Sequence, residues 1–368
     1  MTHLVKTSII SGEIQRKEGD DVSLTTTFQK LRDSILISQR RKEHHDRVRM
    51  IAPKNILTKE QKAQIKDFYA PYGKIDDWYH SFYLQTTGRF CVDYIPEDLH
   101  YCYIDPYFND WRESVYMDDK CYYRRMFTGI RQAEEVASRI GGMWFVGDYE
   151  PITRQQLDQL LANEPEIVVK KAQGSEGGRG VFFVKGVEFS SVEGKIRDDI
   201  IIQRPIKQHP DLAAINTSSV NTIRLMSLLT DGSAKVYSGI LRIGVGGSRV
   251  DNASSGGITC GITWDGKLRQ YAYNAKGQRY ETHPDTGVVF DGYRIPGFQK
   301  CLDQVQKLHV QIPHFRLISW DFSVDSDGEP LLVEANLHYG QLDFHQLNNG
   351  PIFGEDTKKI LDEVFGKK

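Results

Sequence analysis

Two carboxylates and one amide near the C-terminus have the residue types and the spacing of a cation site. They lie in residues 316–336, which read RLISWDFSVDSDGEPLLVEAN. Apolar and polar residues alternate from position 318 to position 324, and this period of two predicts a strand with one buried face. A second apolar run ends on Glu334 and Asn336. Because these residues are two positions apart, their side chains point to the same face of that strand.

The turn between the two strands should bring a further carboxylate to this face. The Asp327-Gly328 dipeptide favours a two-residue hairpin turn. That register places Asp321 directly opposite Glu334. Facing carboxylates with Cβ atoms about 5 Å apart repel each other unless a cation neutralises them. A hard divalent cation does so, and Asn336 supplies a third oxygen ligand. A surface hairpin with solvated acids is the alternative; we favour the metal site because the acids lie within hydrophobic strands.

A glycine-rich stretch in the middle of the chain could hold phosphate groups. It joins an apolar strand at residues 166–171 to a second strand at residues 181–185, which is not the context of a P-loop or a Rossmann fingerprint. Glycines let backbone N–H groups approach phosphate oxygens, and a serine adds a hydroxyl donor. The residues concerned are Gly174, Ser175, Gly177, Gly178 and Gly180. Lys170, at the end of the first strand, can reach an α-phosphate or an adenine edge. A glycine-rich surface turn is the alternative.

Two arginines on a predicted hairpin could bind a carboxylate or a transferring phosphoryl group. Strands are expected at residues 221–229 and 234–243, joined across an Asp-Gly turn. They carry Arg224 and Arg242, and a Ser/Gly-rich turn at residues 250–257 follows. Guanidinium groups hold such oxyanions bidentately, although two ordinary surface arginines would give the same pattern. A regular hairpin would place the two arginines on opposite faces, so either a β-bulge intervenes or only one of them lines the site.

The N-terminal third reads as helices followed by an aromatic-rich segment. A helix is expected from residue 24 to about residue 41, with a basic end typical of a solvated terminus; contact with an anionic partner is the alternative. A capping box at residues 58–61 opens a second helix. Residues 78–123 are rich in aromatic side chains, which indicates core packing more than a sugar-stacking surface. Apolar residues at helical spacing before a Gly-Gly pair predict a further helix at residues 131–140.

Composition limits the class of protein. The chain has 368 residues, of which 39% are hydrophobic, and is long enough for two or three domains. Its net charge of -2 argues against nucleic-acid binding. The five cysteines are scattered and form no CxxC pair, which favours a reducing compartment. With no signal-peptide pattern and no apolar run of membrane-spanning length, the sequence predicts a cytoplasmic protein without a transmembrane segment.

Three segments together resemble the sugar-transfer associated ATP-grasp family. They read SSVNTIRL, ILRIGVGGSRVDNASSGGI, and SWDFSV followed by LLVEAN. The match covers about residue 119 to the end, and it implies an α/β (α+β) ATP-grasp fold with an additional helical, aromatic-rich N-terminal region. Residues 1–118 would form that region, a candidate acceptor-binding part. Residues 119–204 would form the small ATP-grasp subdomain with the glycine-rich phosphate loop, and residues 205–368 the C-terminal subdomain with the magnesium hairpin.

The resemblance also implies ATP and Mg²⁺ as cofactors and a role for each candidate residue. By this resemblance, Lys170 and the loop from Gly174 to Gly180 would bind the triphosphate, and Gln203 and Ile206 would bind adenine. Asp321, Glu334 and Asn336 would bind two magnesium ions. Arg224, Arg242 and Asn252 would bind phosphoryl and carboxylate oxygens. One departure is Ser319, which stands where many ATP-grasp ligases carry an arginine two residues before the metal-binding aspartate.

The chemistry that the resemblance implies is ligation of a carboxylate to an amine. ATP would phosphorylate the carboxylate, magnesium would neutralise charge on the transferring group, and the amine would attack the acylphosphate with release of ADP and phosphate. The expected partners are small-molecule carboxylate and amine substrates, such as an amino acid and a glycan or polysaccharide precursor. A kinase acting on a hydroxyl group and a non-catalytic nucleotide-dependent binding module are the alternatives. His338 is the best placed candidate general base, ahead of His283 and His345.

Overall fold

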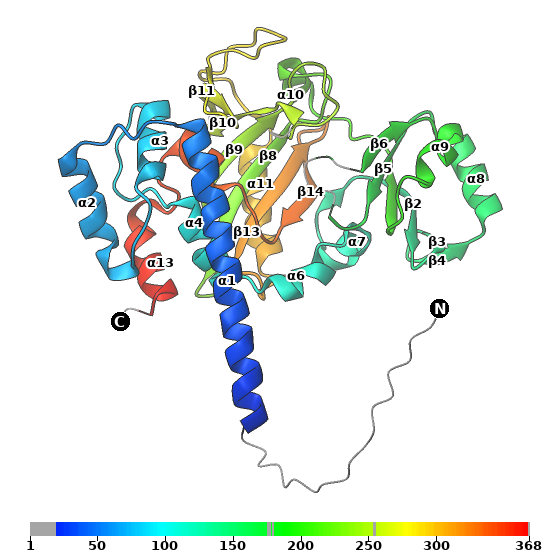
Figure 1. The fold of residues 1–368 in the computed structure, drawn as a ribbon. Helices are drawn as coiled ribbons and strands as arrows, with labels where there is room; N and C mark the ends of the chain where they lie inside the picture. The colour runs from blue at the N-terminus through cyan, green and yellow to red at the C-terminus, as the bar shows by residue number, and fades with distance from the viewer. Residues whose placement is uncertain (1–19, 175–177, 179, 253–254, 367–368) are drawn as a thin grey trace, which may run out of the picture.

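The protein folds around two β-sheets that lie side by side (Figure 1). The computed structural model describes residues 20–174, 178, 180–252 and 255–366; for residues 20–34, Trp111, Val115 and Tyr116 it describes only the backbone. In spatial order, the larger sheet consists of β1 (Arg131–Gln132), β14 (Pro330–Asn336), β13 (Leu317–Val324), β8 (Thr222–Thr230), β9 (Ser233–Ile243), β10 (Ile258–Ile262), β11 (Leu268–Asn274) and β12 (Arg279–Tyr280). The smaller sheet consists of β4 (Glu150–Ile152), β3 (Met143–Val146), β2 (Glu135–Ile140), β7 (Ile200–Gln203), β5 (Ile167–Lys171) and β6 (Val181–Val184).

Helices cover both sheets and form most of the N-terminal third. They are α1 (Asp20–Ile51), α2 (Lys59–Tyr69), α3 (Trp78–Thr87), α4 (Glu97–Leu99), α5 (Asp105–Phe108), α6 (Trp111–Met117), α7 (Tyr123–Met126), α8 (Arg154–Ala162), α9 (Ser190–Glu193), α10 (Pro210–Ile215), α11 (Phe298–His309), α12 (Leu342–Asn349) and α13 (Thr357–Val364). The predicted capping box is present at the start of α2. None of the helices in the described ranges is both long and apolar enough to cross a membrane.

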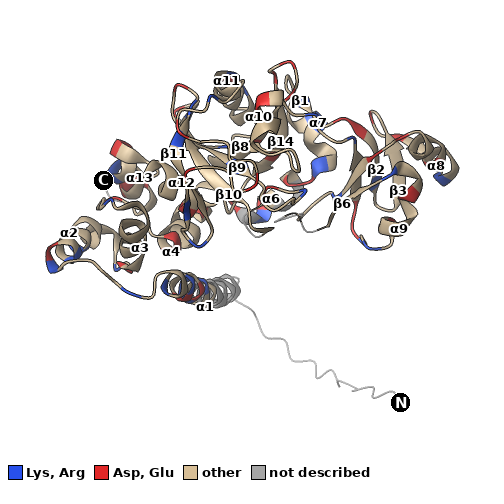
Figure 2. Ribbon diagram, turned by 90° about the horizontal axis from the view of Figure 1, so that it is seen from above, with Lys and Arg blue, Asp and Glu red and all other residues tan. Residues whose placement is uncertain are grey.

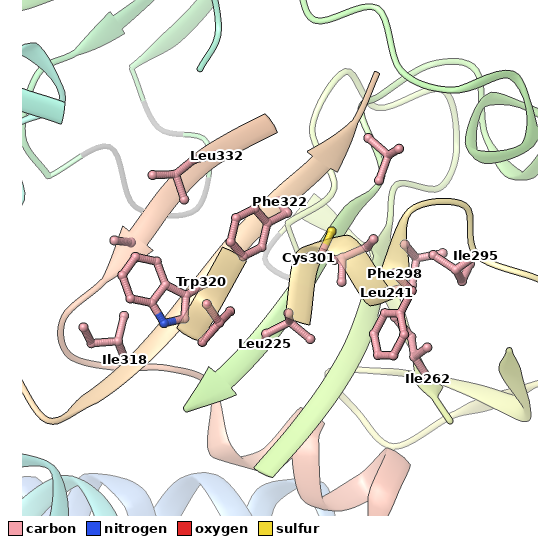
Figure 3. Close-up of a cluster of buried hydrophobic side chains, with 14 of the residues drawn as sticks. Leu225, Leu241, Ile262, Ile295, Phe298, Cys301, Ile318, Trp320, Phe322 and Leu332 are labelled. Carbon is pink, nitrogen blue, oxygen red and sulfur yellow. The ribbon is translucent and has the colours of Figure 1, made fainter. Parts of the chain in front are cut away.

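The main core lies between α11 and one face of the larger sheet. Phe298, Cys301 and Val305 recur at helical spacing on α11 and are buried. They pack against apolar side chains of the central strands, among them Trp320 and Phe322 on β13 (Figure 3). Because side chains alternate along a strand, the polar residues between these apolar ones must project from the opposite face of the sheet.

That opposite face is covered in part by α12 and by the aromatic N-terminal segment. Tyr79, Tyr83 and Tyr94 are almost fully buried there, in one cluster with Phe344 and Leu347 of α12. The prediction that the aromatic segment is mainly core is therefore confirmed for most of the rings that the structure describes, whereas Tyr107 and Tyr122 are exposed. These elements leave one part of this face uncovered, and that part carries the charged residues of the sheet.

The predicted helix at residues 131–140 is wrong. The segment forms β1 and β2, and β2 pairs with both β3 and β7. Gly141 and Gly142 have φ values of 56° and 82°, the left-handed geometry of a tight hairpin turn. The Gly-Gly pair thus connects two strands and does not end a helix.

The prediction of a solvated basic helix end near residue 41 is also wrong. Helix α1 continues to Ile51 and lies next to α3 and α4, and its N-terminal half extends away from the rest of the protein (Figure 1). Figure 2 shows charged residues of both signs along the C-terminal part of α1. Its basic residues pair with acids of other elements: Arg41 with Asp98, and Arg47 with Glu97. Because those acids are buried, the basic run binds the helix to the body.

Candidate active site

The predicted cross-strand pair of Asp321 and Glu334 is present, although the hairpin reaches it by a different route. The Asp325 N–H donates to the carbonyl of Glu329 at 3.0 Å, so the loop has three residues where two were predicted. Alone, this would shift the register by one residue. A β-bulge at Val333 shifts it back, because Phe322 pairs with Leu332 while Asp321 pairs with Glu334.

A second bulge settles which face the two predicted arginines occupy. Met226 pairs with Ser238 and Ser227 with Val236, so Tyr237 is an extra residue in β9. Arg242 consequently lies opposite Thr222, two positions from Arg224, and both arginines share the face that carries Asp321. The sequence left a bulge or a single lining arginine as the options, and the bulge is the one that occurs.

Asp321 is held between these two guanidinium groups. Arg224 donates from Nε and Nη2 to the two carboxylate oxygens, each at 2.7 Å, and Arg242 donates from Nη1 to Oδ2 at 2.8 Å. Burial alone would raise the pKa of Asp321, but the two arginines outweigh it and the pKa is lowered. Arg242 also donates to Asn252 and lies 3.4 Å from Asp251. Asn336 donates to the carbonyl of Ser319 at 3.0 Å and lies 3.5 Å from Asp321 Oδ2.

Glu334 is paired with a residue that sequence reasoning missed. Lys120 Nζ lies 2.8 Å from Glu334 Oε1, and the lysine is only 9% exposed. Burial lowers the pKa of Lys120, but attraction to Glu334 is stronger and the net pKa is raised. The backbone N–H of Lys120 donates to the carbonyl of Ala172, just after β5, which fixes it beside the glycine-rich stretch. No local pattern marks Lys120, because its partner is more than 200 residues away in the chain.

These charged residues open into a cavity of about 380 Å³ between the two sheets, hereafter the main cavity. The basic side chains that line it are Lys120, Lys170, Arg204, Arg242 and Arg249. The acidic side chains are Asp251, Asp321 and Glu334. Apolar side chains of the smaller sheet and of the segment after it complete the wall, among them Val168, Val181, Phe183 and Ile206. Burial, together with the positive charge of Lys120, lowers the pKa of Lys170 to about 8. Arg204 and Arg249 are paired with glutamates outside the cavity, whereas Lys170 forms no ion pair among the described residues. Lys170 and the apolar wall suit an anion attached to a flat apolar ring.

The glycine-rich stretch lies between β5 and β6, as predicted, and its described part borders the main cavity. Gly178, with φ of 75°, approaches so closely that an added Cβ would lie 3.0 Å from Asn252 Nδ2 and 3.2 Å from Val250. The stretch therefore contacts the segment that carries Asn252, across the cavity. Gly174 and Gly180 also have positive φ values, whereas Ser175 and Gly177 lie outside the described residues.

The other predicted residues are distributed around this cavity. Gln203 and Ile206 line it, whereas Arg224 lies behind Asp321 and donates from Nη1 to Gln341 at 2.6 Å. The structure does not bring the secondary histidine candidates to it. His283 is hydrogen-bonded to the carbonyl of Gly244, and His345 is buried and hydrogen-bonded to Ser238.

Ser319 stands where many ATP-grasp ligases have an arginine, and the structure gives a physical reason for the smaller residue. The chain after β14 crosses directly over Ser319, and an added Cβ on Gly340 would lie 2.3 Å from its Oγ. Ser319 is 2% exposed, so a long side chain has no space at this position. Positive charge reaches Asp321 from the neighbouring strands β8 and β9.

A second cavity of about 320 Å³, hereafter the junction cavity, separates the N-terminal region from the glycine-rich stretch. Its walls include Arg40, Tyr101, Asp105, Asp118, Gly174, His338 and Tyr339. Asp118 connects the two cavities: it accepts from the Gly174 backbone and interacts electrostatically with Lys120 and Glu334. Burial raises the pKa of Asp118. The junction cavity thus borders the charged part of the main cavity, and it contains His338, the predicted best placed histidine.

A family model described as sugar-transfer associated ATP-grasp matches residues 101–361. The chain belongs to this family. Its two sheets and the hairpin that carries Asp321 and Glu334 are accordingly the ATP-grasp fold, with the helical, aromatic N-terminal region added. No curated protein sequence matches the chain.

Solved ATP-grasp structures resemble the chain only distantly. The D-alanine–D-alanine ligase from Coxiella burnetii is 13% identical with a TM-score of 0.36, and the match covers 67% of this chain and 57% of the ligase. The ADP complex of N5-carboxyaminoimidazole synthetase from Staphylococcus aureus is 10% identical with a TM-score of 0.41, covering 68% of this chain and 52% of that one. The chain therefore spans about half the length of these proteins. Similarity this low does not bear on the substrate.

Proposed function

We propose that this member of the family is an ADP-forming ligase that activates a carboxylate as an acylphosphate and joins it to an amine. The observation that carries the proposal is the main cavity, where a basic, partly apolar cleft under a glycine hairpin contains a facing pair of acids. ATP fits this combination: Gln203 and Ile206 would contact adenine, and Lys170, the glycine stretch, Arg242 and Asn252 would contact phosphate oxygens. The partners would be small-molecule carboxylate and amine substrates, with a glycan or polysaccharide precursor as one of them.

Magnesium is the metal that the acid pair would take. Asp321, Glu334 and Asn336 offer oxygen atoms on neighbouring strands. Among the residues that the structure describes, no three His, Cys, Asp or Glu side chains gather as a metal centre. This composition suits Mg²⁺, which takes one or two protein carboxylates and completes its shell with water and nucleotide phosphates. When bound, it would neutralise charge on the phosphoryl group that moves.

The residues that now neutralise the acids are the ones that would receive the phosphates. Lys120 and Arg242 bind Glu334 and Asp321 through single ion pairs, and both line the main cavity. A cation taking over the two carboxylates would release these basic groups toward the anionic nucleotide. Arg224, which holds Asp321 through two hydrogen bonds, would keep the aspartate in place.

The junction cavity is the best position for the carboxylate and amine. Arg40 and His338 could orient a carboxylate there, and Asp118 lies on the wall of that cavity and interacts electrostatically with Glu334 and Lys120. A carboxyl group with a raised pKa is suited to accept a proton from an attacking group near neutral pH. The same feature favours the second candidate function, a kinase, because an acceptor hydroxyl needs such a base.

Product analysis tests these functions. The full-length protein would be incubated with Mg-ATP and a panel of amino acids and uronic acids, alone and in pairs, and ADP, phosphate and products would be quantified. A ligase releases ADP and phosphate together only when both a carboxylate and an amine are present. ADP with a phosphorylated acceptor would identify a kinase. Tight ATP binding without turnover across the panel would favour a non-catalytic module and contradict the ligase.

A further inference from the structure

A third cavity lies at the far edge of the larger sheet and takes no part in the proposed reaction. This edge cavity has a volume of about 430 Å³ and lies between β11, the end of α3 and the end of α12. Its walls include Arg89, Arg269, Tyr271, Tyr273, Asp291 and Asn348. It shares no lining residue with the main cavity or the junction cavity.

Arg269 is held in a fixed position at this cavity. Its Nε donates to Asn349 Oδ1 at 2.7 Å. Its aliphatic part lies across Gly261 on the neighbouring strand, where an added Cβ would be 2.8 Å from Arg269 Cδ. The glycine and the asparagine together aim the guanidinium, whose two terminal nitrogens make no hydrogen bond within the described residues.

A second guanidinium stands close by without an acidic partner. Burial and the positive charge of Arg89 lower the pKa of Arg269. Within the described part of the chain, no ion pair joins Arg89 or Arg269 to a carboxylate. Of the acids that line the cavity, Asp265 is paired with Lys267 at 2.8 Å, and Asp291 forms no ion pair with either arginine. The positive charges of the two arginines repel each other, and an oxyanion that binds both guanidinium groups would remove this repulsion.

Asn348 is a fixed part of the wall of the same cavity. It is 6% exposed, and its Nδ2 donates to Thr259 Oγ1 at 2.9 Å and to the carbonyl of Phe344 at 2.8 Å. These bonds fix the orientation of the amide, and its buried Oδ1 has no hydrogen-bond partner. Asn348 therefore shapes the cavity wall beside Arg269.

We propose that the edge cavity binds a small molecule that carries an oxyanion, a carboxylate or a phosphate. The oxyanion contacts Arg89 and Arg269, which both line the cavity. Tyr271 and Tyr273 of β11 form part of the wall. The site is independent of the proposed ligase reaction, because none of its residues contacts the main cavity.

Calorimetric titration of the full-length protein tests the proposal. The probes are inorganic phosphate, glucose 6-phosphate, glucuronate and uncharged glucose. We expect at least one of the three anions to bind and glucose not to bind. Either Arg89→Gln or Arg269→Gln should weaken that binding by about tenfold or more, because each removes a charged hydrogen bond. Arg89 is exposed, so its replacement leaves the fold intact.

Two control variants separate this site from other anion-binding surfaces. Arg279→Gln removes a nearby arginine that packs over Tyr271 at 4.1 Å but does not line the cavity, and Arg242→Gln removes an arginine of the main cavity. Both should bind the anion within about twofold of the wild type. Binding that is lost in Arg242→Gln and kept in Arg89→Gln would assign the anion to the main cavity and overturn the proposal. So would the absence of binding by every anion below about 10 mM.

Discussion

At the residue scale, each acid that lines the main cavity is matched by a basic group from a different element. Asp321 on β13 is held by arginines from β8 and β9, and Glu334 on β14 is held by Lys120. Burying a carboxylate is costly unless such a partner is present. The same residues therefore keep the site folded and place positive charge where phosphates are proposed to lie.

We expect Glu334→Ala to abolish turnover while the protein still folds, with a lower free energy of unfolding because the substitution leaves the buried Lys120 without its partner. The substitution removes a proposed magnesium ligand, and loss of a charge-stabilising group in a buried site typically lowers kcat by about 100-fold or more. ADP release at saturating magnesium and circular dichroism are the measurements. Glu329→Ala is the matched control, because Glu329 lies on the same hairpin but is paired with Lys300 at the surface. Wild-type turnover by Glu334→Ala would refute the assignment.

We expect the titration of Asp105, in the junction cavity, to make the free energy of unfolding depend on pH. Burial raises its pKa to about 7, against hydrogen bonds from Tyr339 and Asn109 that lower it. The folded protein therefore binds the proton more tightly than the unfolded chain. The free energy of unfolding should fall as pH rises from about 4 to about 7, by at most roughly 4 kcal/mol, and stay level above that range.

Asp105→Asn removes this titration, so the variant should gain stability relative to the wild type as pH rises through this window. Urea unfolding of both proteins at pH 4.5, 5.5, 6.5 and 7.5 measures the difference. Parallel stability profiles for the two proteins would show that Asp105 does not titrate in this range.

At the scale of elements, two β-bulges determine which side chains share the site. The bulge at Tyr237 turns Arg242 to the face of Arg224, and the bulge at Val333 restores the pairing of Asp321 with Glu334. If one of these bulges were absent, the register of its hairpin would shift by one residue, and a charged side chain would point into the apolar core under α11. The crossing segment at Gly340 then closes the space beside Asp321.

We expect Gly340→Ala to destabilise the protein by about 1–3 kcal/mol, because the new methyl group would overlap Ser319 Oγ. Adding Ser319→Ala removes the oxygen atom nearest to the clash and should restore part of the loss. Thermal unfolding of the two single variants and the double variant measures this coupling. Strictly additive effects would mean that the two residues do not contact each other as described.

At the scale of the whole molecule, helix α1 is tied to the ATP-grasp body by a network of ion pairs. Arg47 lies between Glu97 of α4 and Asp343 of α12, at distances of 2.8 and 2.9 Å. Gln341, which accepts from Arg224, is two residues from Asp343. The network therefore joins the N-terminal helix to the end of α12 that lies next to Arg224.

We expect Arg47→Ala to lower the free energy of unfolding by roughly 1–2 kcal/mol. The change leaves Glu97 and Asp343 as neighbouring acids without their shared cation, but about half of the arginine side chain is exposed, so water screens part of the effect. Urea unfolding measures it. Lys267→Ala, which removes an exposed pair with Asp265, should cost no more than about 0.5 kcal/mol. Equal losses in both variants would argue against a structural role for the network.

The sequence by itself determined the strands of the site and the position of the glycine hairpin, whereas the facing of Asp321 and Glu334 also depends on the bulge at Val333. Strand periodicity and turn preference act over a few neighbouring residues, so Asp321, Glu334 and the loop after Lys170 could be identified from the order of residue types. The same local reasoning failed at Gly141 and Gly142, because a Gly-Gly pair ends a helix and turns a hairpin equally well.

Only the tertiary structure decided the bulges, the pairing of Lys120 with Glu334 and the attachment of α1. A bulge costs little in itself, and its position is set by the packing of the whole sheet. Lys120 and Glu334 are brought together by folds of the chain that no short segment specifies. The acids of the site can thus be recognised from the residues next to them in the sequence, whereas the basic groups that surround them are set by packing between distant parts of the chain.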